Sequence, residues 1–434
     1  MSEEAASADD ASFGGKSAAG GDIEALERRQ ALCAIAFSNV AHTFTHLLTA
    51  LYATAVLHLP KVFGLPYGDM LSLSSLGLVL YGVGALPAGW LADRWSRAGM
   101  MVIFFLGVGA GSIATGLADG PKTIFVGLTA IGLFASIYHP VGIAWIVASA
   151  RKRGIVLGIN GVFGNIGSSF APLFVGLTID FLSWRAAFLI PGILAILCGI
   201  GLMIALKKGL ATDVENDRAP TPKPGREAAL RVFLILTLTM ACAGFVYAGL
   251  TNTMPKLFEI TLAEIALNPS GDISYTRVGF FVSIVSASAS IFGVIGGWLA
   301  DRRPARTIYI VCWLLHIPLL FGIVWISGLT LFAAILIVYG LNISFTAAEN
   351  MLVAQYAPQR WRSVAYGAKF ALALGIAGLT VIVAGEIFDS RGNFDMFYII
   401  LGLAATAAVI ACILLPKEGP SPTVADPASP RSSS

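Results

Sequence analysis

The sequence predicts an all-α integral membrane protein whose transmembrane helices form two six-helix bundles. Three observations carry this prediction: a very apolar composition, twelve apolar runs of membrane-spanning length, and a six-residue motif that occurs twice about half the chain length apart. Hydrophobic residues make up 56% of the 434 residues, and charged residues make up only 12%, against roughly 25% in soluble domains. So little charge could not cover a water-soluble globule of this size.

The twelve apolar runs are each long enough to cross a hydrocarbon core of about 30 Å as an α-helix. One longer polar segment separates the sixth run from the seventh, which predicts six spans in each bundle. We place the spans at 31–58, 72–92, 100–118, 123–149, 155–180, 185–206, 230–257, 277–299, 307–326, 329–355, 364–387 and 395–415.

The polar segments divide the chain into five regions. Residues 1–28 are rich in Ser, Ala, Gly and acidic residues and lack the apolar core of a signal peptide, so we expect a disordered cytoplasmic tail. Residues 29–206 and 230–416 are the predicted bundles, and the proline-containing segment 207–229 is the predicted cytoplasmic linker. Residues 417–434, rich in Pro and Ser, are expected to form a second disordered cytoplasmic tail.

The distribution of basic residues predicts the orientation. A cytoplasmic N-terminus places most of the 28 Lys and Arg on the cytoplasmic side. The cluster 151–153 lies in a loop of only a few residues, where this bias is most informative. We therefore expect a multi-pass protein of a bacterial inner membrane with both termini in the cytoplasm.

The sequence Gly-Trp-Leu-Ala-Asp-Arg occurs at 89–94 and again at 297–302, after the second span of each predicted bundle. Asp180 and Asp389, which end the fifth and eleventh spans, match at nearly the same offset. Internal repeats of about half the chain length are typical of duplicated transporter halves. The two bundles are thus predicted to be related.

The repeated motif, the twelve spans and the central linker resemble the major facilitator superfamily over roughly residues 30–415. Three segments more narrowly resemble its fosmidomycin-resistance branch of drug exporters: His46-Leu47-Leu48, Tyr138-His139-Pro140 and Gly164-Asn165-Ile166-Gly167-Ser168-Ser169. That branch carries acidic residues where this chain has Ala50 and Val141. This departure weakens the implication of drug and proton exchange, and it leaves passive or differently coupled transport open.

The repeated motif suggests a gate at the cytoplasmic surface, formed by Gly89, Asp93, Arg94, Gly297, Asp301 and Arg302. Its aspartates could accept hydrogen bonds from the free amides at the start of a neighbouring helix, and its glycines would permit close helix approach. The resemblance implies that the first aspartate holds the eleventh span near Ser363 and the second holds the fifth near Gly154, when the cytoplasmic side is closed. The alternative is two caps without a gating role.

Polar residues inside the predicted spans mark the candidate transport site, because such groups are expensive in a membrane and are usually functional. His42 and His46 lie one helical turn apart and share a face. The resemblance implies that the first, fourth, seventh and tenth spans line a central cavity. The full candidate set is His42, His46, Tyr138, His139, Asn165, Asn342, Glu349, Asn350 and Lys369.

These residues also have structural interpretations. His42 could simply bond to a facing helix, and Asn165 could belong to a close helix contact. Glu349 and Lys369 could form a buried ion pair, which would not exclude a role in coupling. For proton coupling the candidates are His46, His139 and Glu349, because imidazole titrates near neutral pH and burial shifts a carboxyl group toward it. The balance of histidines and lysine over one glutamate favours an anionic or zwitterionic solute.

We expect a secondary transporter that moves a small solute by alternating access, with proton-coupled export of a small organic compound as the first choice. The alternatives are proton-coupled uptake of a small organic anion, transition-metal ion transport through His42, His46, His139 and Glu349, and a non-transporting scaffold or sensor. The sequence holds no nucleophile motif, so an enzyme is not expected. We expect no resident metal, cofactor or nucleic-acid partner. The expected partners of this monomer are the solute, protons and the lipid bilayer.

Overall fold

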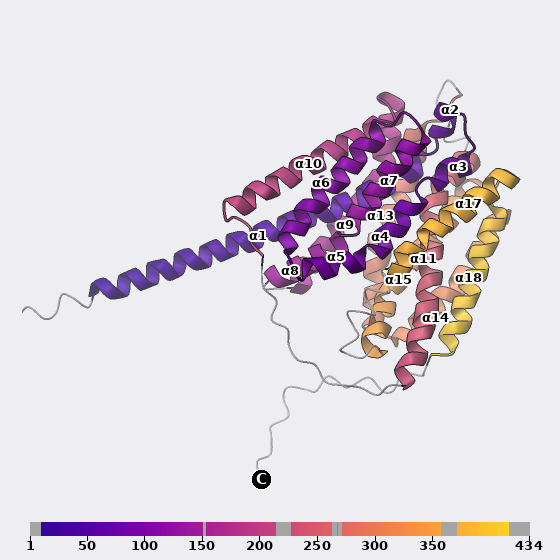
Figure 1. The fold of residues 1–434 in the computed structure, drawn as a ribbon. Coiled ribbons are helices and arrows are strands. Elements are labelled where there is room, and N and C mark those ends of the chain that lie inside the picture. The colour runs from indigo at the N-terminus through magenta and orange to yellow at the C-terminus, as the bar shows by residue number, and fades with distance from the viewer. Residues whose placement is uncertain are drawn as a thin grey trace, which may run out of the picture.

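Two bundles of membrane-spanning helices make up the molecule (Figure 1). The computed structural model describes residues 10–150, 153–213, 227–262, 267, 271–356 and 371–415. Within these ranges 11 helices are long and apolar enough to cross a membrane, or up to 12 when the bent pair Tyr67–Val83 and Ala85–Ala92 counts as one span. The predicted all-α membrane fold of two six-helix bundles is therefore confirmed.

Two spans of the N-terminal bundle depart from regular helix. The second bends by 40° where α4 gives way to α5. The fourth contains a π-helical turn, η1, around Pro140, because proline has no amide hydrogen to continue the regular pattern. The elements of this bundle are α1 (Asp10–Ala55), α2 (Leu59–Phe63), α3 (Tyr67–Ser72), α4 (Ser75–Val83), α5 (Ala85–Ala92), α6 (Arg97–Gly116), α7 (Pro121–Ala135), η1 (Tyr138–Gly142), α8 (Ile143–Ser149), α9 (Arg153–Phe181) and α10 (Ala186–Lys207).

The C-terminal bundle repeats the plan without the bend in its second span. Lys369 and the first part of the eleventh predicted span lie outside the described residues. The elements of this bundle are α11 (Glu227–Thr261), α13 (Tyr275–Ala300), α14 (Ala305–Gly322), η2 (Ile323–Trp325), α15 (Gly328–Tyr356), α17 (Ala377–Arg391) and α18 (Asp395–Ile413).

Two segments outside the predicted spans differ from the expectation. Helix α1 begins at Asp10, so residues 10–28 are helical where a disordered tail was expected. Alanine, glutamate and arginine are strong helix formers and extend the first span. The start of the expected linker packs on the N-terminal bundle, because Trp145 donates to the Thr212 carbonyl at 3.1 Å and Asp213 accepts from the Ala98 amide at 2.9 Å.

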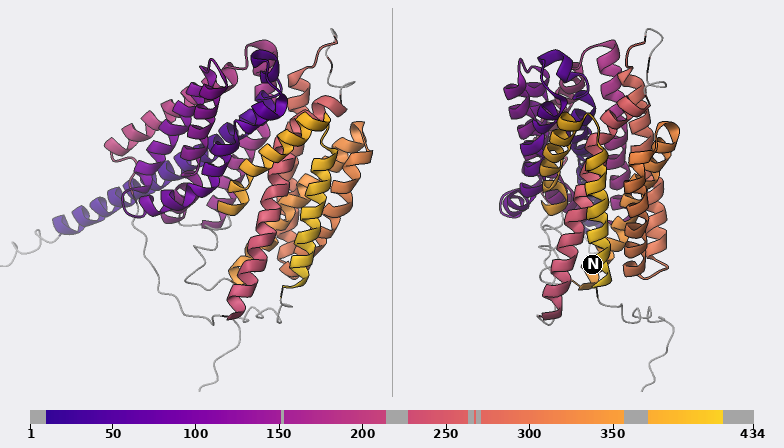
Figure 2. Two further views of the ribbon diagram at one scale, coloured as in Figure 1. Left: turned by 45° about the vertical axis from the view of Figure 1, so that its right-hand side comes forward. Right: turned by 90° about the vertical axis from the view of Figure 1, so that its right-hand side faces the viewer.

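The bundles meet at one end of the molecule and spread at the other. They converge where α2, α3 and the end of α17 lie, and they diverge where α5, α8 and the start of α14 lie (Figures 1 and 2). We name the spread end, where the first half runs into the linker at Lys207, the linker end. The converged end is the opposite end.

Glycines permit the close contact between the bundles. Gly68 on α3 lies against the Gly385 backbone on α17, and Gly279 on α13 lies against the Pro172 backbone on α9. A side-chain carbon at either glycine would overlap the facing backbone. Toward the linker end this contact is lost, since nothing lies within 4 Å of a carbon built on Gly154 or Gly158. The two bundles therefore form a wedge that is closed at the opposite end.

Candidate functional site

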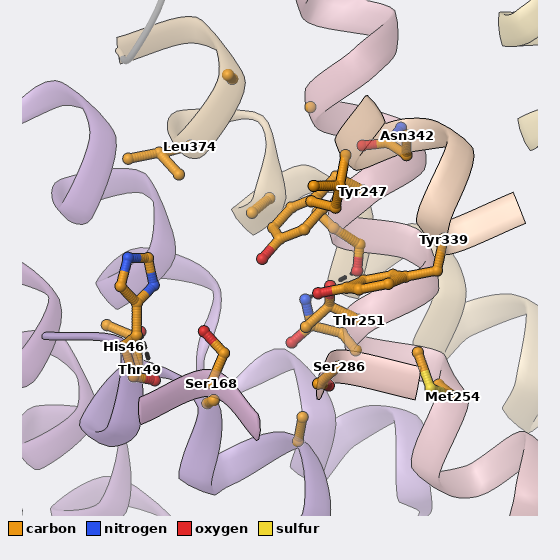
Figure 3. Close-up of a pocket in the computed structure, with 18 of the residues that line it drawn as sticks. His46, Thr49, Ser168, Tyr247, Thr251, Met254, Ser286, Tyr339, Asn342 and Leu374 are labelled. Carbon is orange, nitrogen blue, oxygen red and sulfur yellow. Dashed lines mark hydrogen bonds between the residues drawn. The ribbon is translucent and has the colours of Figure 1, made fainter. Parts of the chain in front are cut away.

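A cavity of about 350 Å³ lies between the two bundles. His46 and Ser168 of the N-terminal bundle face Tyr247, Thr251 and Tyr339 of the C-terminal bundle across it (Figure 3). Ligand sites near the midplane between structural repeats are typical of secondary transporters. Of the predicted site residues, the described lining includes His46, His139, Asn342 and Glu349.

The C-terminal wall combines aromatic rings with polar groups. The rings of Tyr247 and Tyr339 are stacked with centroids 5.8 Å apart and planes at 28°, and both hydroxyls point into the cavity (Figure 3). Asn252 also lines the cavity, and its Nδ2 donates to the Ala248 carbonyl at 2.9 Å. Such a wall offers flat apolar surface together with several hydrogen-bond donors.

Three histidines converge on the N-terminal side. One ring nitrogen from each of His42, His46 and His139 lies within 4.8 Å of the others. Nε2 of His46 lies 3.2 Å from Nε2 of His42, and the hydroxyl of Tyr81 lies 3.0 Å from Nε2 of His139. Here we call these three histidines the imidazole cluster. His46 and His139 line the cavity, whereas His42 is buried behind them.

Asn160 holds the buried side of the imidazole cluster. Its carbonyl accepts a hydrogen bond from Nδ1 of His42 at 2.7 Å, and its side-chain oxygen accepts one from the Tyr138 hydroxyl at 2.9 Å. Its Nδ2 donates to the Asn39 side chain at 2.9 Å. Tyr138 also stacks on His42 at 4.6 Å. Tyr138 is therefore a supporting residue behind the cavity wall. The role of His46 and His139 in proton coupling stays a prediction.

The two glycines of the Gly-Asn-Ile-Gly segment on α9 let groups of α1 approach closely. A side-chain carbon at Gly164 would lie 2.5 Å from Nε2 of His42, so the absence of a side chain there makes room for the ring. Gly167, three residues on, lies against the Thr43 backbone. Asn165 points elsewhere and donates from Nδ2 to the Ser290 hydroxyl, which joins α9 to α13 of the other bundle.

Glu349 lines the cavity from the C-terminal bundle and does not join the imidazole cluster. Its side chain is 3% exposed, and its Oε1 accepts a hydrogen bond from the Tyr309 hydroxyl at 2.8 Å. The predicted ion pair with Lys369 falls outside the described residues and stays a prediction. Asn350 is partly buried and is not part of the described cavity lining, whereas the buried Asn342 is.

The repeated motif lies at the linker end in both bundles. Asp93 is 51% exposed and accepts from Arg97 at 3.2 Å. Among the described residues, no hydrogen bond joins Asp301 to a helix of the other bundle. Gly89 packs on Pro140 of η1, because a side-chain carbon built on Gly89 would lie 3.2 Å from Cβ of Pro140. Nothing lies within 4 Å of a carbon built on Gly297.

The arginines of the motif make the same contact twice. Arg94 lies over the ring of Trp90 at 4.2 Å, and Arg302 lies over the ring of Trp298 at 4.4 Å. Both tryptophans are more than half exposed, as expected for aromatic residues at a membrane surface. The duplication of sequence is therefore also a duplication of local geometry.

At the opposite end, two other aspartates bridge the bundles. Asp389 of α17 accepts from the amides of Gly68 at 2.8 Å and Asp69 at 3.2 Å, at the start of α3. Asp180 of α9 likewise accepts from the start of α13, through the amides of Tyr275 at 3.2 Å and Thr276 at 2.8 Å. The Ser274 hydroxyl also donates to Asp180 at 3.0 Å.

Sequence reasoning missed several residues of the site. It matched Asp180 with Asp389 as a repeat and assigned them no contact, although acids that end corresponding spans could have suggested one. Tyr81 and Tyr339 gave no signal because tyrosine is common in apolar spans. His316 was also missed. It is fully buried on α14 and contacts the Cys312 carbonyl at 2.7 Å.

Two similar bundles of spanning helices around a central cavity are the architecture of a secondary membrane transporter. The chain belongs to the Major Facilitator Superfamily, which it matches over residues 39–379. This membership makes the protein a transporter and not an enzyme.

Three curated relatives match over most of their length. The gallate transporter of Pseudomonas putida is 25% identical over 80% of this chain and 82% of its own. The 4-hydroxybenzoate transporter of the same organism is 23% identical over 80% and 83%. A probable sulfoacetate transporter of Cupriavidus necator is 22% identical over 81% and 88%.

Solved structures show the same fold. A POT family transporter in complex with 5-aminolevulinic acid is 13% identical, with a TM-score of 0.72 over 89% of this chain and 96% of that one. A bacterial homologue of the human lysosomal transporter Spinster, solved in an inward-facing and occupied conformation, is 16% identical. Its TM-score is 0.68 over 88% of this chain and 93% of that one. At these identities the likeness supports the fold alone.

Proposed function

We propose that this protein transports a small organic anion across a bacterial inner membrane by alternating access. The observation that carries the proposal is the cavity wall, where the rings of Tyr247 and Tyr339 stand next to hydroxyl and amide groups. An aromatic acid would stack on these rings and accept hydrogen bonds from their hydroxyls. Relatives named for gallate, 4-hydroxybenzoate and sulfoacetate support the same substrate class.

The conformation follows from the orientation that the basic residues predict. With both termini in the cytoplasm, the linker end is the cytoplasmic end. The spread of the bundles there, together with the aspartate contacts at the opposite end, corresponds to an inward-open state. We propose that the protein works as a monomer, because each chain holds its own cavity between its two bundles.

Glu349 is the proposed proton-coupling residue. Its carboxylate lies in the cavity lining and accepts from Tyr309, so uptake of a proton would break that bond or reverse its direction. A buried environment disfavours the charged carboxylate, whereas a hydrated environment favours it. Protonation of Glu349 would therefore bias which side of the cavity is open.

Proton-coupled export of a small organic compound is the second candidate. The observation that favours it is that His46, His139 and Gly164, which carry the likeness to the fosmidomycin-resistance branch, come together in one cluster. The missing acids at Ala50 and Val141 argue against this candidate. Direction of transport separates the two functions.

Reconstituted vesicles test the proposal directly. Vesicles with purified protein should accumulate labelled gallate or 4-hydroxybenzoate when a proton gradient is imposed, and unlabelled anion should compete. Glu349→Gln should lose gradient-driven accumulation by at least tenfold but keep exchange of anion against anion. The matched control is Glu386→Gln, a carboxylate on α17 that is exposed and outside the described lining.

Two results would contradict this function. Proton-driven efflux of an organic compound, with no gradient-driven accumulation of organic acids, would favour the exporter alternative. Gradient-driven accumulation that Glu349→Gln leaves intact would exclude Glu349 as the coupling residue.

A further inference from the structure

The geometry points to a binding site for a divalent first-row transition ion, such as Zn²⁺, in the imidazole cluster formed by His42, His46 and His139. This site goes beyond the proposed anion transport and does not depend on it. Imidazole nitrogen is a preferred ligand of zinc, cobalt and nickel ions. Three imidazole ligands and one open position is a known coordination pattern for zinc.

The spacing of the nitrogens suits such an ion. A tetrahedral ion with Zn–N distances of about 2.0–2.1 Å places its nitrogen ligands about 3.3 Å apart. Nε2 of His42 and Nε2 of His46 lie 3.2 Å apart. The widest separation in the cluster is 4.8 Å or less, which rotation of one ring about its side-chain bonds can close.

The surroundings of His42 are those of a metal-binding imidazole. Ligating histidines usually donate their second ring N–H to a carbonyl or carboxylate, which fixes the tautomer and the ring orientation. The Asn160 carbonyl can only accept, so Nδ1 of His42 carries the proton and Nε2 keeps its lone pair. Tyr138 covers one face of the ring, and Gly164 lies against Nε2, so the ring is held in place.

The site is open on one side. His46 and His139 are only partly buried and line the central cavity, while His42 closes the site from behind. Three neutral imidazoles leave the charge of a divalent ion uncompensated. Its fourth ligand would therefore be a water molecule or an anionic group from the cavity.

The position of the ligands marks the ion as resident and not as cargo. All three histidines belong to the N-terminal bundle, on α1 and η1, so the site stays intact when the bundles move apart. Glu349 does not join the cluster but bonds to Tyr309 in the C-terminal bundle. A transported ion would instead need ligands from both sides of the moving interface.

Metal binding to purified protein tests the site. The protein should carry a tag without histidine, be freed of metal by a chelator, and then be titrated with Zn²⁺ and with Co²⁺. We expect one ion per chain, a visible absorption spectrum of four-coordinate Co²⁺, and a higher melting temperature with Zn²⁺. His46→Ala and His139→Ala should each weaken binding at least tenfold. His58→Gln, which changes a histidine outside the cluster, should bind like the wild type.

If an alanine variant does not fold, His46→Gln and His139→Gln serve instead, because glutamine keeps a polar side chain without the imidazole. Equal binding by the wild type and the cluster variants would overturn the proposal, and so would a spectrum of six-coordinate Co²⁺. Uptake of radioactive zinc into vesicles would overturn the resident role. These results do not depend on anion transport, so the two proposals can fail separately.

Discussion

Each end of the molecule carries a pair of aspartates that follows the internal repeat, and the structure describes contacts between the bundles for only one of the two pairs. At the opposite end, Asp180 and Asp389 each accept hydrogen bonds from the start of a helix in the other bundle. At the linker end, Asp93 bonds to the neighbouring Arg97, and its predicted partner near Ser363 lies outside the described residues. Among the described residues, Asp301 has no hydrogen bond to the other bundle. Both pairs follow the internal repeat. In this conformer, the pair with described contacts between the bundles is the one at the closed end.

The physical basis is the helix start. Its first amides have no partner inside the helix and carry a partial positive charge, which a carboxylate satisfies. When the bundles separate at one end, those amides and the carboxylate become hydrated. Exchange of one aspartate pair for the other would let the closed state at each end have similar free energy, which is what alternating access requires.

The largest expected effect comes from removing both engaged carboxylates. In Asp180→Asn with Asp389→Asn, loss of the charge should destabilise the closed opposite end by about 3 kcal/mol in all, at about 1.5 kcal/mol per charged acceptor, and so shift the population more than about a hundredfold. The measurement is labelling by a membrane-impermeant maleimide at Thr54→Cys, a buried position in the cavity lining, with the five native cysteines replaced. Unchanged labelling from the opposite side would show that these contacts do not hold the gate.

A smaller effect is expected from the backbone contact beside Asp389. Gly68→Ala would place a carbon against the Gly385 carbonyl, and relieving that overlap should destabilise the closed end by about 1–2 kcal/mol. The same maleimide assay should report faster labelling. Gly158→Ala is the matched control, because nothing lies within 4 Å of its added carbon. Equal labelling in the two variants would indicate that α3 and α17 adjust without cost.

The smallest effect should come from the aspartate pair at the linker end. Asp93→Asn removes a half-exposed ion pair with Arg97, worth no more than about 1 kcal/mol in this conformer. Its loss should mainly weaken the state that is closed at the linker end. In Asp93→Asn, maleimide labelling of an introduced Thr346→Cys, on the cavity side of α15, should therefore rise modestly. The melting temperature of the protein should stay nearly constant. A large fall in melting temperature would instead indicate a structural cap without a gating role.

The fold was largely predictable because membrane spans leave strong local signals. Length and hydropathy of each run located the spans, and the duplicated motif predicted the two related bundles. The bend at Gly84 was not predicted, since it depends on how the second span packs. The π-helical turn was also not predicted, although the Pro140 that causes it is present in the sequence. The helical stretch that begins at Asp10 was missed because composition alone favoured disorder.

The site was predictable only in part. His42 and His46 were expected to share a helix face because their spacing fixes it, and His139 was singled out by its motif. That all three meet at one point depends on the packing of α1 against η1 and α9. Glu349 and the histidines were grouped as ligands in one alternative, yet the structure places them in different clusters.

The sequence by itself determined that the chain spans a membrane, how many spans it has and that its two halves are related. Each of these properties depends on residues close in the chain or on a repeat that can be read directly. The tertiary structure alone decided which aspartates are engaged, which polar side chains face the cavity and which histidines converge. Those properties depend on distances between helices far apart in the sequence. Such distances are set by the packing of glycines and aromatic rings. Short patterns in a single sequence do not predict that packing.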